Sequence, residues 1–141
     1  MTQITLDTSK GQLVPFIFGQ DAVAASQDNV QLPAVMCEAS SAVDGYAMPF
    51  KFDVVAISAS LSAAGSAGTL TLGATIGGTE DADTTLTITT GTELYKVIPR
   101  GKASGAAGAR LGCELTTDGS WNGTSADILV TIWALVYLDG I

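Results

Sequence analysis

The side chains that could carry out chemistry are few and scattered. The 141-residue sequence has 14 Asp and Glu residues, 2 Cys residues and no His. Without His, the chain lacks the commonest general base and metal ligand, which excludes the usual Ser–His and Cys–His catalytic arrangements. A Ser/Lys pair is not excluded by the residue types, but no spacing isolates one. The glycine-rich segment 73–78 lacks the Lys and the following helix of a phosphate-binding loop. We therefore predict a protein that is not an enzyme and holds no cofactor.

The best candidate for a cation site is the cluster of Glu80, Asp81 and Asp83, which follows Gly77 and Gly78. Carboxylates on a turn suit calcium, which takes roughly six to eight oxygen ligands. The complete ligand spacing of a calcium loop is absent, and acidic residues are ordinary at the tip of a β-hairpin. We predict a solvated loop here and no metal site.

Trp121 and the two cysteines each allow two interpretations. The Trp121 indole either stands exposed, where a sugar ring could stack on it, or packs over one end of a β-sandwich. Cys37 and Cys113 are far apart, with no second Cys or His near either, which excludes a zinc site. We predict two buried thiols that act as small hydrophobic side chains. A disulfide is the alternative, disfavoured because cytosolic synthesis keeps thiols reduced.

Charge and hydropathy restrict the partners. The formal net charge is −8, whereas binding to nucleic acid or to an anionic membrane relies on Lys and Arg, so neither is an expected partner. The first residues lack the positive start and the apolar stretch of a secretion signal. The apolar run 128–138 is shorter than the ~20 residues of a membrane helix. We expect cytoplasmic synthesis, and the hydrophobic fraction of 47% fits a surface partly covered by another subunit.

Short runs rich in β-branched residues, separated by Gly, Ser and Asp, fill the last two thirds of the chain. The predicted strands cover residues 54–61, 69–72, 84–89, 95–99, 110–115 and 128–138. Turn residues break the chain at the short intervals that are typical of an all-β sandwich or barrel. Leu111, Cys113 and Leu115 alternate with polar or small residues and are expected to point inward. We predict one antiparallel β-sandwich domain over residues 46–141.

Two strands depart from simple alternation. The apolar pattern changes phase at Val54 and Val55, which predicts either a β-bulge or a strand buried on both faces. The last strand is apolar on both faces. Its second face carries Leu129, Trp133, Leu135 and Tyr137. We expect either the N-terminal segment or another subunit to cover this second face.

Residues 1–45 are predicted to form an extended N-terminal arm. Its apolar patch around Pro15 is expected to be buried, either against the chain's own sandwich or against a neighbouring subunit. With the arm outside the sandwich, deleting the residues before Val30 is expected to leave the sandwich folded and to weaken attachment to a partner. The candidate interface residues combine this patch with the last strand: Leu13, Phe16, Ile17, Phe18, Leu129, Trp133, Leu135 and Tyr137.

The order of segments from residue 48 to residue 136 resembles the small β-domains of tailed-bacteriophage virions. These comprise head decoration (cement) proteins, head fibres and related tail modules. The resemblance is carried by the strand-and-turn patterns of residues 57–72, 108–121 and 127–133, and it covers about two thirds of the chain.

This resemblance implies a jelly-roll-like antiparallel sandwich that forms a homotrimer. Such a trimer would sit on the outer surface of the head at local three-fold positions and contact neighbouring major capsid protein subunits, after assembly in the host cytoplasm. The protein would then be a structural virion protein that stabilises the capsid. The alternative is a carbohydrate- or receptor-binding module of a head or tail fibre, which would use Trp121 and the loops at residues 77–83 and 101–108.

Overall fold

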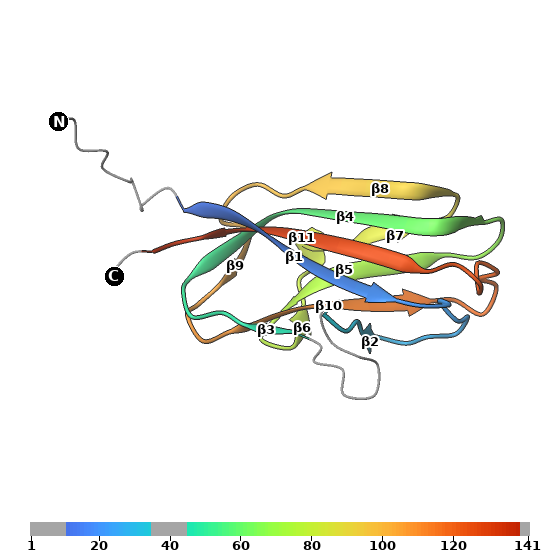
Figure 1. Cartoon of the computed structure of the whole chain (residues 1–141), viewed down its shortest axis with the longest axis horizontal. Helices are drawn as coiled ribbons and strands as arrows, with labels where there is room; N and C mark the ends of the chain where they lie inside the picture. Colours follow the sequence, from blue (N-terminus) through green and yellow to red (C-terminus); the bar gives the residue numbers. More distant parts are fainter. Residues whose placement is uncertain (1–10, 35–44, 139–141) are drawn as a thin grey trace.

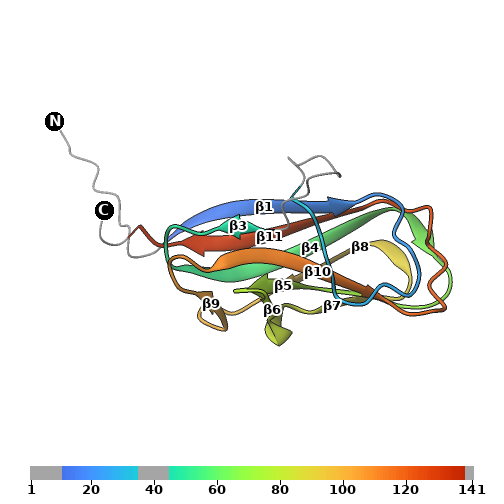
Figure 2. The same ribbon diagram turned by 90° about the horizontal axis from the view of Figure 1, so that it is seen from below.

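In the part of the chain that the structure describes, eleven strands form two antiparallel sheets that face each other. The computed structural model describes residues 11–34 and 45–138. Sheet A contains, in spatial order, β1 (Gln12–Gln20), β11 (Ile128–Val136), β4 (Phe52–Gly65) and β8 (Gly91–Val97), and β9 (Ala103–Gly105) pairs with β4. Figures 1 and 2 show the two layers from two directions. The prediction of an all-β antiparallel sandwich is confirmed.

Sheet B lies beneath sheet A and completes the sandwich. Its main order is β2 (Val30–Gln31), β10 (Arg110–Thr117), β5 (Leu70–Ile76) and β6 (Thr79–Glu80), while β3 (Tyr46–Ala47) pairs with β10 and β7 (Leu86–Ile88) pairs with β5. A short 3-10 helix, η3 (Ala82–Thr84), precedes β7. No helix in the described part of the chain is long and apolar enough to cross a membrane.

The hydrophobic core fills the space between the two sheets. Sheet A contributes Phe18, Phe52, Val54, Ile57, Val130 and Ile132, and sheet B contributes Leu70, Leu72, Leu111, Cys113 and Leu115, all nearly or fully buried. The inward orientation predicted for Leu111, Cys113 and Leu115 is confirmed. Burial raises the pKa of the Cys113 thiol far above its ordinary value, so the sulfur stays protonated and acts as a core side chain. Cys37 lies outside the described residues.

The phase change at Val54 and Val55 is a β-bulge. Opposite β11, Ala56 pairs with Trp133 and Val54 pairs with Ala134, so Val55 is an extra residue without a partner in that register. Inserting one residue shifts the side-chain alternation by one position. The bulge therefore keeps both Val54 and Ile57 in the core although they are an odd number of residues apart.

Residues 12–20, expected to belong to an extended arm, form the edge strand of sheet A. All nine residues of β1 pair in register with β11, from Gln12 opposite Val136 to Gln20 opposite Ile128. The following loop returns across the end of the sandwich, where Val23 is buried in the core. The chain's own sandwich therefore covers one side of the apolar patch, that of Phe16 and Phe18, whereas Leu13 and Ile17 on the other side of β1 stay exposed. Residues 1–10 and 35–44 of the expected arm lie outside the described residues.

Candidate interaction surface

The strand registers define a continuous outer face of sheet A. Residues that lie directly opposite in an antiparallel pair point to the same side of a sheet. Pro15 pairs with Trp133, Trp133 with Ala56, and Ala56 with Val97, so these four residues form one row across the outer face. Neighbouring rows run through Leu13 and Leu135, through Ile17 and Tyr95, and through Gly19 and Leu129.

The part of this face over β1 and β11 is apolar and open. We call it the apolar strip and define it as Leu13, Pro15, Ile17, Trp133 and Leu135. Leu13 is 57% exposed and Ile17 is 38% exposed, while Trp133 and Leu135 are half-buried. β1 lies beside β11 in the same sheet and leaves its outer face uncovered. The alternative in which the N-terminal segment covers the second face of the last strand therefore does not hold for the described residues.

A second apolar patch lies at the opposite edge of sheet A. On β8, Tyr95 is 76% exposed and Val97 is 69% exposed. Their partners on β4 are the small residues Ser58 and Ala56, so a low region separates this edge patch from the apolar strip. Tyr95 and Val97 are not among the candidate interface residues predicted from the sequence. The charged residues Glu93 and Lys96 in the same short strand conceal them, because charged side chains are ordinary in an edge strand.

The structure divides the eight candidate interface residues between two faces. Leu13, Ile17, Leu129, Trp133 and Leu135 lie on the outer face of sheet A, with Leu129 47% exposed. Phe16 and Phe18 point to the other side of β1 and pack edge-on against the Tyr46 ring, with centroid distances of 5.0 and 5.5 Å. Phe18 is therefore a core residue and Phe16 packs, partly buried, against the core, whereas their neighbours in β1 remain available to a partner.

Tyr137, the eighth candidate, is buried in a polar cluster at one end of the outer face. Its hydroxyl donates to Asp53 Oδ2 at 2.6 Å and accepts from Arg100 Nε at 2.6 Å. Ser104 donates to the other oxygen of Asp53, and the Arg100 guanidinium lies 5.0 Å from the centre of the Tyr137 ring. Burial, together with the hydrogen bond to Asp53, raises the pKa of Tyr137 above its ordinary value. The cluster joins the 98–105 segment to β4 and to the residue that follows β11.

Trp121 is buried and is not a sugar-stacking platform. Its indole Nε1 donates to the carbonyl oxygen of Val23 at 3.1 Å, and its ring lies against Gly65 and Gly123, where a Cβ would come within about 3.0 and 2.5 Å of ring atoms. Of the two interpretations of Trp121, packing over the end of the sandwich is the one observed. The glycan-binding alternative thereby loses the aromatic residue on which it rested.

The acidic cluster is engaged in local hydrogen bonds. Asp81 Oδ1 accepts from the backbone N–H of Asp83 and caps η3, while Glu80 Oε1 accepts from the Thr85 hydroxyl at 2.7 Å. Partial burial and the neighbouring Glu80 raise the pKa of Glu114 on β10. Among the described residues, no three Cys, Asp or Glu side chains gather in a way that could hold a metal ion.

Comparison with known proteins does not assign the chain to a family. No protein-family model matches the sequence, and no curated protein matches it significantly. A function is therefore inferred from the fold and from the open outer face of sheet A.

Proposed function

We propose that the protein is a structural virion protein that decorates and stabilises a bacteriophage capsid as a homotrimer. In this proposal it is made in the host cytoplasm, binds the outer surface of the major capsid protein, and remains on the virion. The observation that carries the proposal is the apolar strip, which joins exposed Leu13 and Ile17 to half-buried Trp133 on one open sheet face. The resemblance to tailed-phage β-domains is the reason for proposing a capsid as the assembly to which the protein binds.

The composition of the apolar strip supports burial against protein. Soluble monomers rarely expose large contiguous apolar patches, and such patches commonly mark interaction sites. Tryptophan is among the residues that contribute most to binding at protein interfaces, especially near their centre. Trp133 lies in a row between Pro15 and Ala56, with Leu13 and Leu135 in the next row. No member of the strip is charged, so identical acidic subunits can meet there without bringing like charges together.

The separation of two apolar patches on sheet A supports a ring. The apolar strip lies over β1 and β11 at one side, and the edge patch of Tyr95 and Val97 lies on β8 at the other. Contact between two different patches is heterologous, and repetition of such a contact gives a cyclic oligomer when the rotation between subunits closes. A trimer in which the strip of one subunit meets the edge patch of the next buries both patches three times.

A jelly-roll topology belongs to the same proposal. Jelly rolls are double-sheet sandwiches of eight main strands, and many virion proteins have this fold. The orders β1-β11-β4-β8 and β2-β10-β5-β7 support this topology, because the chain passes repeatedly from one sheet to the other and each sheet mixes early and late strands.

Attachment to capsids tests the proposed function. We expect the purified protein to sediment with empty capsids of the virus that encodes it, and to raise the temperature at which those capsids break apart, because each bound trimer adds buried area between capsid subunits. An unrelated acidic protein of similar size is the control. If the protein stays in the supernatant as this control does, capsid decoration is contradicted.

A further inference from the structure

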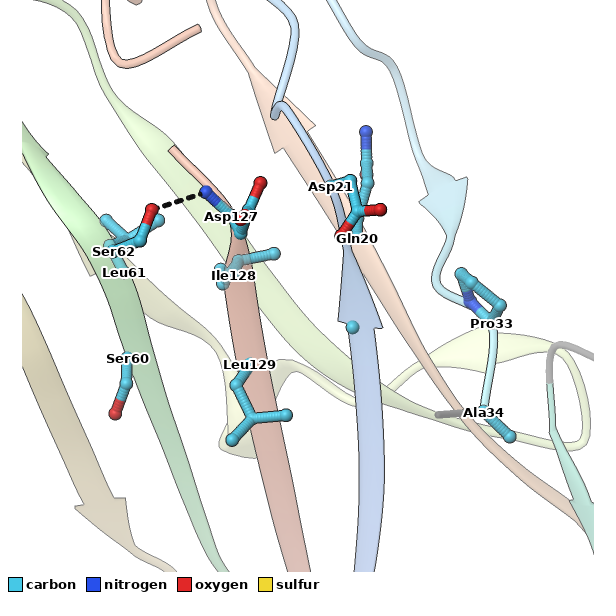
Figure 3. Close-up of a pocket in the computed structure, with 11 residues that line it drawn as sticks. Gln20, Asp21, Pro33, Ala34, Ser60, Leu61, Ser62, Asp127, Ile128 and Leu129 are labelled. Carbon is cyan, nitrogen blue, oxygen red and sulfur yellow. Dashed lines mark hydrogen bonds between the residues drawn. The ribbon is translucent and has the colours of Figure 1, made fainter. Parts of the chain in front are cut away.

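A groove crosses the outer face of sheet A at the end opposite to the Tyr137 cluster. Its larger part is a hollow of about 740 Å³ around Leu129, bordered by Gly19 of β1, Ser60 of β4 and the segment at Pro33 and Ala34. Figure 3 shows Leu129 between Ser60 on one side and Pro33 and Ala34 on the other. A smaller hollow of about 340 Å³ continues over β4 to Glu93 and Tyr95 on β8, and Ser60 belongs to both. Tyr95 also belongs to the edge patch, so the groove adjoins, at this residue, the surface proposed to join subunits.

Small residues create this groove. Gly19 pairs with Leu129, Leu129 with Ser60, and Ser60 with Glu93, so they form one row across four strands. Gly19 has no side chain and Ser60 has a short one, which leaves the Leu129 side chain standing in a low region. The Gly19 N–H donates to Pro33 O at 3.1 Å, which fixes the far wall of the groove against β1.

All charged side chains that line the groove are carboxylates. Asp21 and Asp127 border the larger hollow, and Glu93 borders the smaller one; neither lining includes Lys or Arg. Asp127 is held in place, because its Oδ1 accepts from Ala22 N–H at 3.0 Å and its own N–H donates to Ser62 Oγ at 2.8 Å. A carboxylate has about four lone-pair sites, so Asp127 retains the capacity to accept from a partner.

We propose that this groove binds an extended segment of a partner protein in which basic residues alternate with apolar ones. Apolar side chains of the segment lie against Leu129, and its Lys or Arg side chains meet Asp21, Asp127 and Glu93. The identity of the partner rests on the proposed function, under which this segment belongs to the capsid protein. A second copy of the chain does not fit, since it carries 14 acidic against 6 basic residues and would bring like charges together.

The length of the segment follows from the strand spacing. From the Pro33 segment through β1, β11 and β4 to β8, the groove spans four interstrand distances, or about 19 Å. An extended chain rises about 3.3 Å per residue, so roughly six residues cross the groove. Such a segment places its apolar side chains down against Leu129. Its long Lys or Arg side chains leave the opposite side of the extended chain and reach around it to the carboxylates at the rim of the groove.

The test adds a capped peptide of that length, in which Lys and Val alternate, to the full-length protein. Binding is monitored by the changes in the amide chemical shifts of the protein. We expect shifts at Gly19, Ser60 and Leu129, with a millimolar dissociation constant that increases with salt. Asp21→Asn/Glu93→Gln is expected to raise this constant about fivefold, because each exposed ion pair contributes modestly. The control, Asp28→Asn/Asp83→Asn, removes the same charge from exposed positions outside the groove and is expected to change it little.

Three results would overturn the groove proposal. These are the absence of shifts at the groove residues, equal weakening by the control variant, and equal binding of a peptide in which Glu replaces Lys. Capsid sedimentation is measured separately, so the two proposals can fail independently. Sedimentation without peptide binding rejects the groove alone, and peptide binding without sedimentation rejects the capsid as partner.

Discussion

Replacing Trp133 by Asp is expected to convert the homotrimer into monomers. Trp133 is half-buried in the apolar strip, so the folded subunit tolerates a polar side chain there better than a core position does. At an interface, loss of a central tryptophan typically costs 2 kcal/mol or more, and an unpaired buried carboxylate adds a desolvation cost. We expect association to weaken by on the order of a hundredfold or more. Sedimentation velocity of the purified variant measures the change.

Two further variants separate a loss of contact from a general effect of charge. Thr89→Asp adds the same charge at an exposed position outside the outer face of sheet A and should leave the trimer intact. Leu13→Asp changes an exposed member of the strip and should weaken the trimer even if Trp133→Asp proves insoluble. Trimers that persist at unchanged strength in both Trp133→Asp and Leu13→Asp would place the strip outside the subunit interface.

Deleting residues 1–29 is expected to abolish cooperative folding, contrary to the expectation for an arm that stands outside the sandwich. The deletion removes β1, which pairs along its whole length with β11, and it removes the fully buried Phe18 and Val23. Each of these two side chains contributes about 1.5–3 kcal/mol by burial alone, against a typical total stability of about 5–15 kcal/mol. The Trp121 Nε1–H would also lose its acceptor, Val23 O.

Thermal unfolding followed by circular dichroism and tryptophan fluorescence measures this effect. A shorter deletion that stops before Gly11 leaves every described strand whole and serves as the control. We expect a sharp transition for this control and a gradual change without a midpoint for the longer deletion. A longer deletion that melts as sharply as the full chain would show that β1 is dispensable, and that the arm interpretation was right.

Local patterns in the sequence were sufficient to predict the sheets and the inner face. The β-branched runs become β4, β5, β10 and β11 to within a few residues. The phase change at Val55 marks the bulge because side-chain alternation has a period of two, and one extra residue reverses it. The same alternation assigns Phe16 and Phe18 to one side of β1 and Leu13 and Ile17 to the other, so the apolar patch around Pro15 is divided between two faces.

Contacts between distant segments could not be predicted in this way. β1 is the neighbour of β11 although the whole chain separates them, and no local pattern specifies that pairing. The cluster of Asp53, Arg100 and Tyr137 likewise joins three segments that no motif connects. The groove depends on Gly19, Ser60 and Pro33 coming together, and small residues in a sequence do not reveal what they will border.

The most direct test of the central claim, that the outer face of sheet A joins copies of this chain, is the mass of the full-length protein in solution. Light scattering at two concentrations determines it without a label. We predict a stable species of three times the 14.3 kDa chain mass at both concentrations, because the apolar strip and the edge patch cover each other in a closed ring. A species of 14.3 kDa at both concentrations would contradict the claim, since both patches would then face water.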